Sequence, residues 1–191
     1  MQEAVPAGEG AMAAILGLDR ALVAQACEEA KDSGVVQVAN LNAPGQTVIA
    51  GAAAAVKRAV ELAKGKGAKR ALPLPVSAPF HSALMAPAAA RLETVLGAVR
   101  VRDLRVPLVT NVDAELLTDG ARVRDTLVRQ VTAPVRWEEG IGRLVKENVE
   151  TFIEVGPGKV LSGLVRRIAP QARVLNVEDR SSLQSTMEAL R

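Results

Sequence analysis

The sequence predicts an α/β protein in two parts, and the order of its apolar runs is the main reason. Between residues 11 and 75 the signals run strand, helix, strand, strand, helix, strand, which is the split βαβ, or ferredoxin-like, pattern. After residue 100, strand-like and helix-like stretches alternate, which is typical of a parallel sheet covered by helices. We therefore expect a ferredoxin-like βαββαβ subdomain at residues 11–75 and a second subdomain built from residues 1–10 and 76–191.

Each element of the first part has its own local signal. Residues 11–18 form a short apolar run of the kind found in buried strands, and Asp19 is placed to cap the helix that follows. Asn42-Ala43-Pro44-Gly45 separates two strand-forming runs and predicts a hairpin. The predicted strands are 11–18, 35–41, 46–50 and 68–74, and the predicted helices are 20–31 and 52–64.

The second part is predicted to begin with an extended segment that ends at Pro79. A residue before proline is kept out of the α region, so a helix can start only after Ala78-Pro79. We expect a helix at 82–99 with His81 at or near its N-terminus, and Pro87 marks either a kink or the true start. The later predicted strands are 106–112, 151–155 and 173–177, and the later predicted helices are 123–131, 138–147, 159–168 and 181–190. Doubly wound sheets usually have about five or six strands, so this sheet looks incomplete.

Composition excludes several classes of function. Hydrophobic residues make up 49% of the 191 residues and charged residues 24%, which is ordinary for a globular chain. Aromatic residues make up only 2%, which argues against recognition of single strands by base stacking. The net charge of +3 comes from interspersed charges and is not the footprint of a nucleic-acid-binding protein. We expect no nucleic-acid partner.

Cysteine and histidine are too scarce for a disulfide framework or a transition-metal site, because Cys27 and His81 are the only residues of their kinds. The sequence also contains neither a signal peptide nor an apolar run of about 18 residues, the length that a membrane span needs. We expect a cytoplasmic protein with no metal and no membrane association.

His81 is the candidate for proton-transfer chemistry, since imidazole titrates near neutral pH unaided. A base of this kind needs a nucleophile, and no Gly-x-Ser-x-Gly elbow occurs in the sequence. Ser82 is adjacent in sequence, Ser77 lies on the preceding loop, and Cys27 falls on an apolar helix face. The alternative is a surface histidine at the junction of a loop and a helix.

Gly156-Pro157-Gly158-Lys159 lacks the Walker A spacing and favours a tight strand-to-helix turn over a phosphate site.

Almost the whole chain resembles one enzyme family, the bacterial malonyl-CoA:acyl-carrier-protein transacylases. The segments that carry the likeness are in order and correctly spaced. They are residues 1–6, 42–51 (NAPGQTVIAG), 69–85 (KRALPLPVSAPFHSALM), 109–113 (VTNVD), 128–137 (VRQVTAPVRW) and 154–161 (EVGPGKVL). The likeness covers roughly the last two thirds of the family's chain.

The resemblance implies an activity and a set of roles. The family transfers malonyl from coenzyme A to the phosphopantetheine thiol of acyl carrier protein in fatty acid synthesis, through an acyl-serine. It implies no cofactor, with malonyl-CoA as substrate and acyl carrier protein as partner. His81 would be the general base, oriented by the backbone carbonyl of Gln130, and Phe80 beside it would fit malonyl. Asn42 and Gln46 would face the substrate, although a plain hairpin turn is also compatible with them.

The chain departs from the family in three places. It lacks the Gly-His-Ser-Leu-Gly elbow with the nucleophile, the Gly-Gln-Gly segment of the oxyanion hole, and the arginine that pairs with the malonyl carboxylate. The second subdomain would then be only part of an α/β-hydrolase-like parallel sheet. We expect the isolated chain to be inactive and to self-associate through the incomplete sheet. Two alternatives remain, a non-catalytic binding module and one half of a split acyltransferase completed by another chain.

Overall fold

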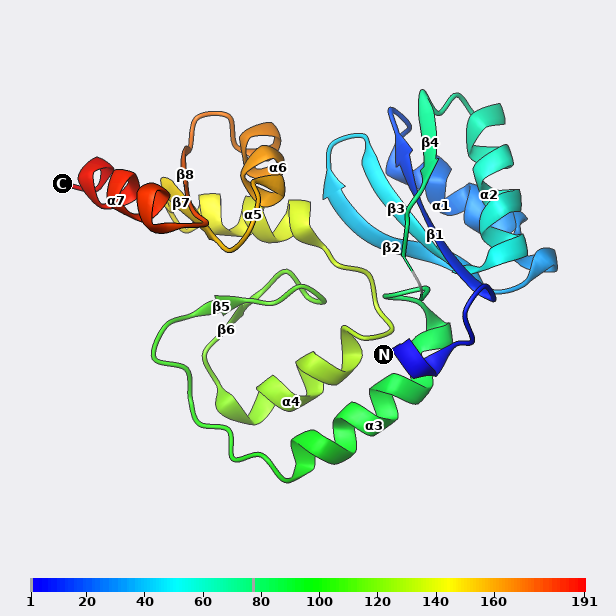
Figure 1. The fold of residues 1–191 in the computed structure, drawn as a ribbon. Coiled ribbons are helices and arrows are strands. Elements are labelled where there is room, and N and C mark those ends of the chain that lie inside the picture. Colours follow the sequence, from blue (N-terminus) through cyan, green and yellow to red (C-terminus); the bar gives the residue numbers. More distant parts are fainter. Residues whose placement is uncertain (1, 77) are drawn as a thin grey trace.

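The first part of the chain forms a four-stranded antiparallel sheet in the order β2-β3-β1-β4 (Figure 1). The computed structural model describes residues 2–76 and 78–191. The elements of this part are β1 (Gly10–Leu16), α1 (Arg20–Glu29), the 3₁₀ turn η2 (Lys31–Ser33), β2 (Val36–Ala43), β3 (Gln46–Ala52), α2 (Ala53–Gly65) and β4 (Arg70–Pro73). This order along the chain and across the sheet is the ferredoxin-like arrangement predicted from the sequence.

Both faces of this sheet are buried, and alternate residues of β1 show it. Ala13 and Ile15 point into a cluster shared with α1 and α2, which both cover one face. Met12 and Ala14 point to the other face, where Phe80 packs against the sheet. Because side chains alternate between the two faces of a strand, a continuous apolar run is the expected signature of such a doubly covered strand.

Two local features fix the boundaries of these elements. The Asp19 carboxylate accepts a hydrogen bond from the Ala21 N–H at 2.8 Å, so it caps α1 as predicted. Gly51 lies in β3 directly against β2, where a Cβ atom would stand 2.0 Å from the Val35 carbonyl oxygen. Only glycine allows this close approach of the two strands.

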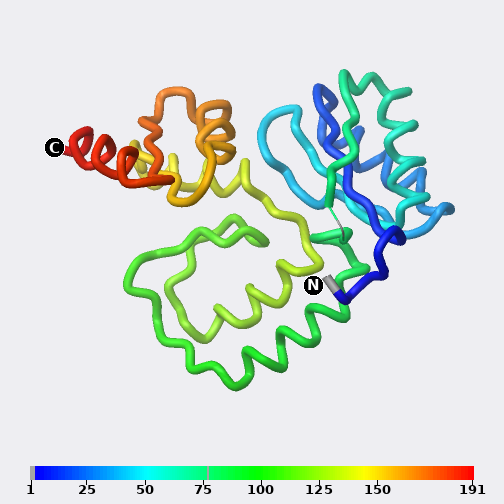
Figure 2. Tube along the Cα trace, viewed as in Figure 1, coloured from blue at the N-terminus to red at the C-terminus, as the bar shows by residue number. Residues whose placement is uncertain are grey.

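The second part contains more helix than strand. Its elements are η3 (Ala83–Met85), α3 (Ala86–Gly97), β5 (Leu108–Val109), β6 (Leu116–Leu117), α4 (Gly120–Arg129), α5 (Trp137–Lys146), β7 (Thr151–Val155), α6 (Val160–Ile168), β8 (Arg173–Val177) and α7 (Arg180–Ala189), with the short η1 (Gln2–Ala4) near the N-terminus. Figure 2 traces the chain away from the sheet along α3 and back toward it after α4.

The prediction of a strand at 106–112 in the parallel sheet is wrong. Only Leu108 and Val109 are extended there, and they pair antiparallel with β6. Within the described residues, the parallel sheet is the pair β7–β8, with Thr151 opposite Arg173. A strand needs a neighbouring strand to bond its backbone, and the strand that pairs with residues 108–109 in this structure is the two-residue β6.

The prediction that a helix starts directly after His81 is also wrong. A 3₁₀ turn at Ala83–Met85 intervenes, and α3 begins at Ala86 with Pro87 in its first turn. Pro87 therefore marks the true start of α3 and not a kink, since proline is tolerated where the N–H has no helical partner.

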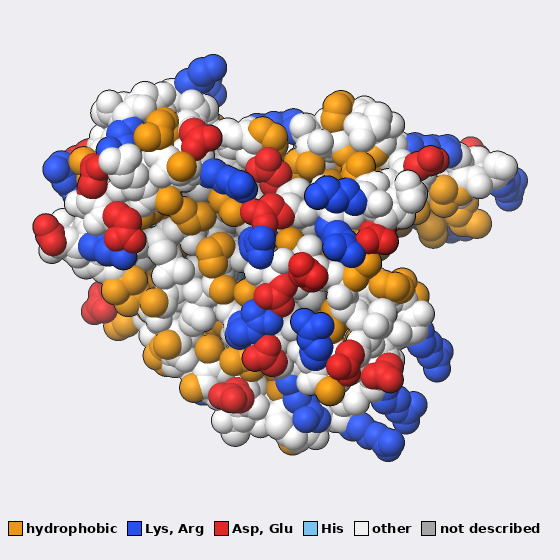
Figure 3. Space-filling view, turned by 180° about the vertical axis from the view of Figure 1, so that it is seen from behind, with side chains coloured by type: hydrophobic (Ala, Val, Ile, Leu, Met, Phe, Trp, Pro, Cys, Tyr) orange, Lys and Arg blue, Asp and Glu red, His pale blue; other side chains and the backbone are white. Residues whose placement is uncertain are grey.

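The edge formed by β7 and α6 leaves large apolar side chains in solvent. Val155 is 78% exposed, Val160 73% and Ile153 41%. Seen from behind, the surface is notched, and hydrophobic side chains show beside the notch (Figure 3).

Among the described residues, no helix combines the length and the apolar character that crossing a bilayer requires.

Candidate active site

His81 lies in a tight turn with a backbone φ of +60°, in the left-handed region. This conformation costs a residue with a side chain about 1–2 kcal/mol. The turn is anchored on its C-terminal side by Ser82, which is fully buried and donates its hydroxyl proton to the Pro79 carbonyl oxygen at 2.6 Å. Met85, also fully buried, donates its N–H to the Ser82 carbonyl at 2.9 Å. Packing thus holds His81 in a conformation that it would not adopt alone.

The half-buried His81 ring bonds to the C-terminal end of α4. Its Nδ1 lies 2.8 Å from the Gln130 carbonyl oxygen. A carbonyl oxygen can only accept, so Nδ1 carries the proton and donates it. In the neutral ring Nε2 is then the unprotonated, basic nitrogen. This is the contact that the resemblance implies for Gln130, and the catalytic role of the pair stays a prediction.

Side chains next to Gln130 hold its end of α4 in place, and sequence reasoning missed them. Arg129 donates two hydrogen bonds to the Asp113 carboxylate, at 2.8 and 2.7 Å. The hydrogen bond from Arg129 holds the pKa of Asp113 below its usual value, against a smaller opposing effect of burial. Asn111 donates its side-chain N–H to the Gln130 side-chain oxygen at 3.4 Å. The pattern VTNVD was visible in the sequence, but its pairing with Arg129 was not.

Phe80 joins two apolar clusters beside the His81 turn. It is half-buried and packs both against the sheet face that includes Met12 and Val48 and against the group around Met85 and Val131. The ring therefore couples the turn to the sheet, whatever further role it has toward a substrate.

Asn42 and Gln46 flank the hairpin turn between β2 and β3. The Gln46 side-chain oxygen accepts a hydrogen bond from the Arg167 guanidinium of α6, and Arg167 also donates to the Pro44 carbonyl at 2.8 Å. The structure thus ties the hairpin tip to α6. The substrate-binding roles of both residues stay predictions.

Two of the three nucleophile candidates named from the sequence, Ser82 and Cys27, are not placed to act with His81. The Ser82 hydroxyl is fully buried and bonded to Pro79, and Ser77 lies outside the described residues. Burial raises the pKa of the Cys27 thiol to about 12, so it stays protonated at neutral pH. In the part of the chain that the structure describes, no group of three or more His, Cys, Asp or Glu side chains is placed to hold a metal ion.

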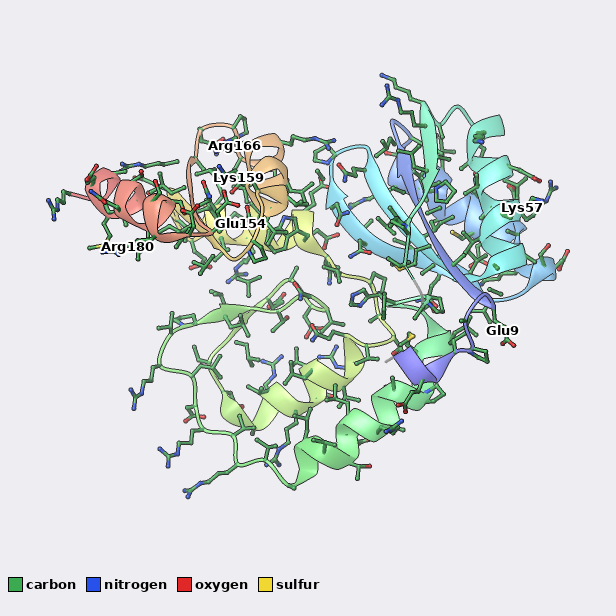
Figure 4. All side chains as sticks on the ribbon, viewed as in Figure 1. Glu9, Lys57, Glu154, Lys159, Arg166 and Arg180 are labelled. Carbon is green, nitrogen blue, oxygen red and sulfur yellow. The ribbon has the colours of Figure 1, made fainter. Side chains whose placement is uncertain are left out.

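At the turn between β7 and α6, the Glu154 carboxylate bonds to the first backbone N–H groups of α6. Glu154 accepts hydrogen bonds from the Leu161 N–H at 3.1 Å and the Ser162 N–H at 2.7 Å. Burial is the largest single influence and acts to raise the pKa of Glu154, but the hydrogen bonds from Ser162 and Leu161 and the nearby charge of Arg166 together outweigh it and lower the pKa. Figure 4 shows Glu154 and Lys159 on this connection. The helix N-terminus is occupied, which agrees with the tight turn favoured from the sequence.

The acyl transferase domain family model matches residues 1–184 of this sequence. The chain belongs to the acyl transferase domain family. Relatives of this chain include the malonyl CoA-acyl carrier protein transacylases of Bacillus subtilis strain 168 and Escherichia coli K12. Both are 50% identical to it, and the matches cover 100% and 98% of this chain, respectively. It spans 61% of the length of each of these two relatives.

Solved structures that match this chain include proteins whose titles name the same kind of transacylase. One is a type II PKS acyl-carrier protein in complex with its malonyl-transacylase, with a TM-score of 0.95 and 44% identity over 98% of this chain and 61% of that chain. Another is the malonyl CoA-acyl carrier protein transacylase of Clostridium perfringens, with a TM-score of 0.96 and 41% identity over 100% of this chain and 60% of that chain. The chain therefore shares the fold of the matched regions of both proteins.

Proposed function

We propose that this chain is the general-base portion of a malonyl-CoA:acyl-carrier-protein transacylase. The observation that carries the proposal is the His81 ring, whose Nδ1 is bonded to the Gln130 carbonyl at 2.8 Å. A base held in one tautomer, beside a turn that packing keeps strained, is the arrangement that proton transfer in acyl exchange requires. The identity to relatives named as transacylases supports the choice of malonyl as the acyl group.

In the proposed reaction, His81 Nε2 takes the proton of a serine hydroxyl as that oxygen attacks the malonyl thioester carbon. When the tetrahedral intermediate collapses, the carbon–sulfur bond breaks and the imidazolium returns its proton to the thiolate of coenzyme A. The phosphopantetheine thiol of acyl carrier protein then attacks the malonyl-serine in the same way and regenerates the serine. The Gln130 carbonyl holds the His81 ring in one orientation and stabilises the imidazolium at each step.

The substrate roles follow the resemblance. Phe80 would line the malonyl site, and Asn42 and Gln46 would contact the substrate from the hairpin. We propose malonyl-CoA and acyl carrier protein as partners, no cofactor, and a cytoplasmic setting.

A complementation assay tests the proposal, because the serine has to come from outside this sequence. The chain is mixed with a separately expressed segment of the Bacillus subtilis relative that covers the part of that protein not matched here. Transfer of radiolabelled malonyl from coenzyme A to holo acyl carrier protein is then measured. We expect no transfer by the chain alone, transfer by the mixture, and a loss of about 10²–10⁴-fold with His81→Ala.

Robust transfer by the chain alone, or an active mixture that is indifferent to His81→Ala, would refute the proposed role. The exposed β7 edge, with Val155 78% exposed, favours completion by a second segment.

If the mixture is inactive while the chain alone binds holo acyl carrier protein, the binding-module alternative holds. Size-exclusion chromatography of the chain alone tests the expected self-association.

A further inference from the structure

The side chain of Gln37 joins the two turns that carry His81 and Gln130. Gln37 lies in β2, and its Nε2 donates to the His81 carbonyl oxygen at 3.3 Å and to the Thr132 carbonyl oxygen at 3.2 Å. Its Oε1 accepts a hydrogen bond from the Ala83 N–H at 3.0 Å. One half-buried amide therefore bonds to the His81 carbonyl, to the N–H of the residue two places after His81 and to the residue two places after Gln130.

The two turns belong to different segments, and β2 is the frame that they share. The segment after Gln130 is also attached to β2 through Val135, which donates its N–H to the Ala39 carbonyl and accepts from the Leu41 N–H, both at 2.8 Å. On the His81 side, Gln37 is the β2 side chain that bonds both the His81 carbonyl and the Ala83 N–H. Through Gln37, one side chain thus links the backbone after His81 to the segment after Gln130.

We propose that Gln37 is a positioning residue that holds His81 against the Gln130 carbonyl and so selects the ring tautomer. Its significance for catalysis rests on the function proposed above, whereas its effect on the ring does not. The left-handed backbone of His81 needs outside support, and the bonds from Gln37 to the His81 carbonyl and from the Ala83 N–H to Gln37 contribute to it on the C-terminal side of this residue.

Glutamine is suited to this position for a chemical reason. Two carbonyl oxygens need a donor, and one N–H needs an acceptor. A side-chain amide is neutral and offers both, with two N–H bonds on one nitrogen and a carbonyl oxygen beside it. Glutamate would keep the acceptor for Ala83 but place an acceptor against two carbonyls, and methionine would fill the space with neither function.

The test uses the fact that His81 is the only histidine in the chain. The full chain is labelled with ¹⁵N-histidine, and long-range ¹H–¹⁵N correlation reports which ring nitrogen is protonated. Spectra are recorded at about pH 9, above the ordinary titration range of imidazole. The variants are Gln37→Met and Gln37→Glu. The control is Gln184→Met, because Gln184 is exposed on α7, and among the described residues its side chain bonds to Glu188 alone, at 3.1 Å.

We expect the wild type and the control to show the Nδ1-protonated ring almost alone, and both Gln37 variants to show at least several-fold more of the Nε2-protonated form. Variants that stay folded by circular dichroism with an unchanged ring would overturn the role of Gln37. Loss of the fold in both variants would overturn it as well, because Gln37 would then support the fold and not the ring. A wild-type ring with the tautomer ratio of free histidine would instead contradict the His81–Gln130 geometry, and with it the function proposed above.

Discussion

The left-handed backbone at His81 predicts that glycine is more stabilising than alanine at this position, which is the reverse of the usual order. Replacing alanine by glycine normally weakens a protein, because glycine has more freedom in the unfolded chain. At a φ of +60°, however, alanine carries steric strain that glycine does not. We therefore expect His81→Gly to be more stable than His81→Ala.

The magnitude follows from two opposing contributions. Strain costs alanine about 1.5 kcal/mol in this conformation. The extra freedom of glycine in the unfolded chain costs about 0.7 kcal/mol. The difference leaves His81→Gly more stable by about 0.8 kcal/mol, or about 2–3 °C in Tm for a chain of this size. Both variants lose the ring and its bond to Gln130, so that loss cancels in the comparison.

Urea unfolding followed by circular dichroism measures the difference. Ala90→Gly is the matched control, since Ala90 is exposed within α3 and should lose about 1 kcal/mol in the ordinary direction. If His81→Gly is less stable than His81→Ala by a similar amount, the backbone at this residue is not left-handed and the account of the turn fails.

Two further predictions concern the surroundings of the site and the sheet. The folded-state pKa of Asp113 is lowered by its bond from Arg129, so the stability it contributes is present above the ordinary aspartate pKa and is lost as pH falls through the lowered value. Asp113→Asn should therefore reduce the fall in urea midpoint on acidification, and an unchanged pH profile would contradict the pairing. Gly51→Ala should destabilise the chain by more than about 3 kcal/mol, because its Cβ would meet the Val35 carbonyl. Gly65→Ala, with open space around it, should be neutral or slightly stabilising in the same urea titration, and equal effects of the two would show that the strand contact is not tight.

Much of the first part could be predicted because its signals are local. The period of the apolar residues, the Asp19 cap and the Asn42–Gly45 turn each act within a few residues, and together they specify the order of strands and helices. The start of α3 could not be predicted in the same way. After Pro79, residues 81–85 look helical, yet the Ala83 N–H bonds to a glutamine side chain 46 residues away instead of beginning a helix.

The prediction of a strand at 106–112 was wrong for a related reason. Its composition suits a strand, but strand formation depends on a partner that lies elsewhere in the chain or outside it, and local pattern does not report that partner.

The sequence by itself determined that His81 is the only imidazole available and that the chain is built like one kind of acyl transferase. Only the tertiary structure decided which ring nitrogen is basic and what holds it there. The Gln130 carbonyl is 49 residues from His81, and Gln37 reaches partners 44 and 95 residues away. A backbone carbonyl exists at every position and carries no sequence signal of its own, so residue patterns alone do not single out Gln130. The family resemblance named it, and the folded chain places its carbonyl oxygen at the ring.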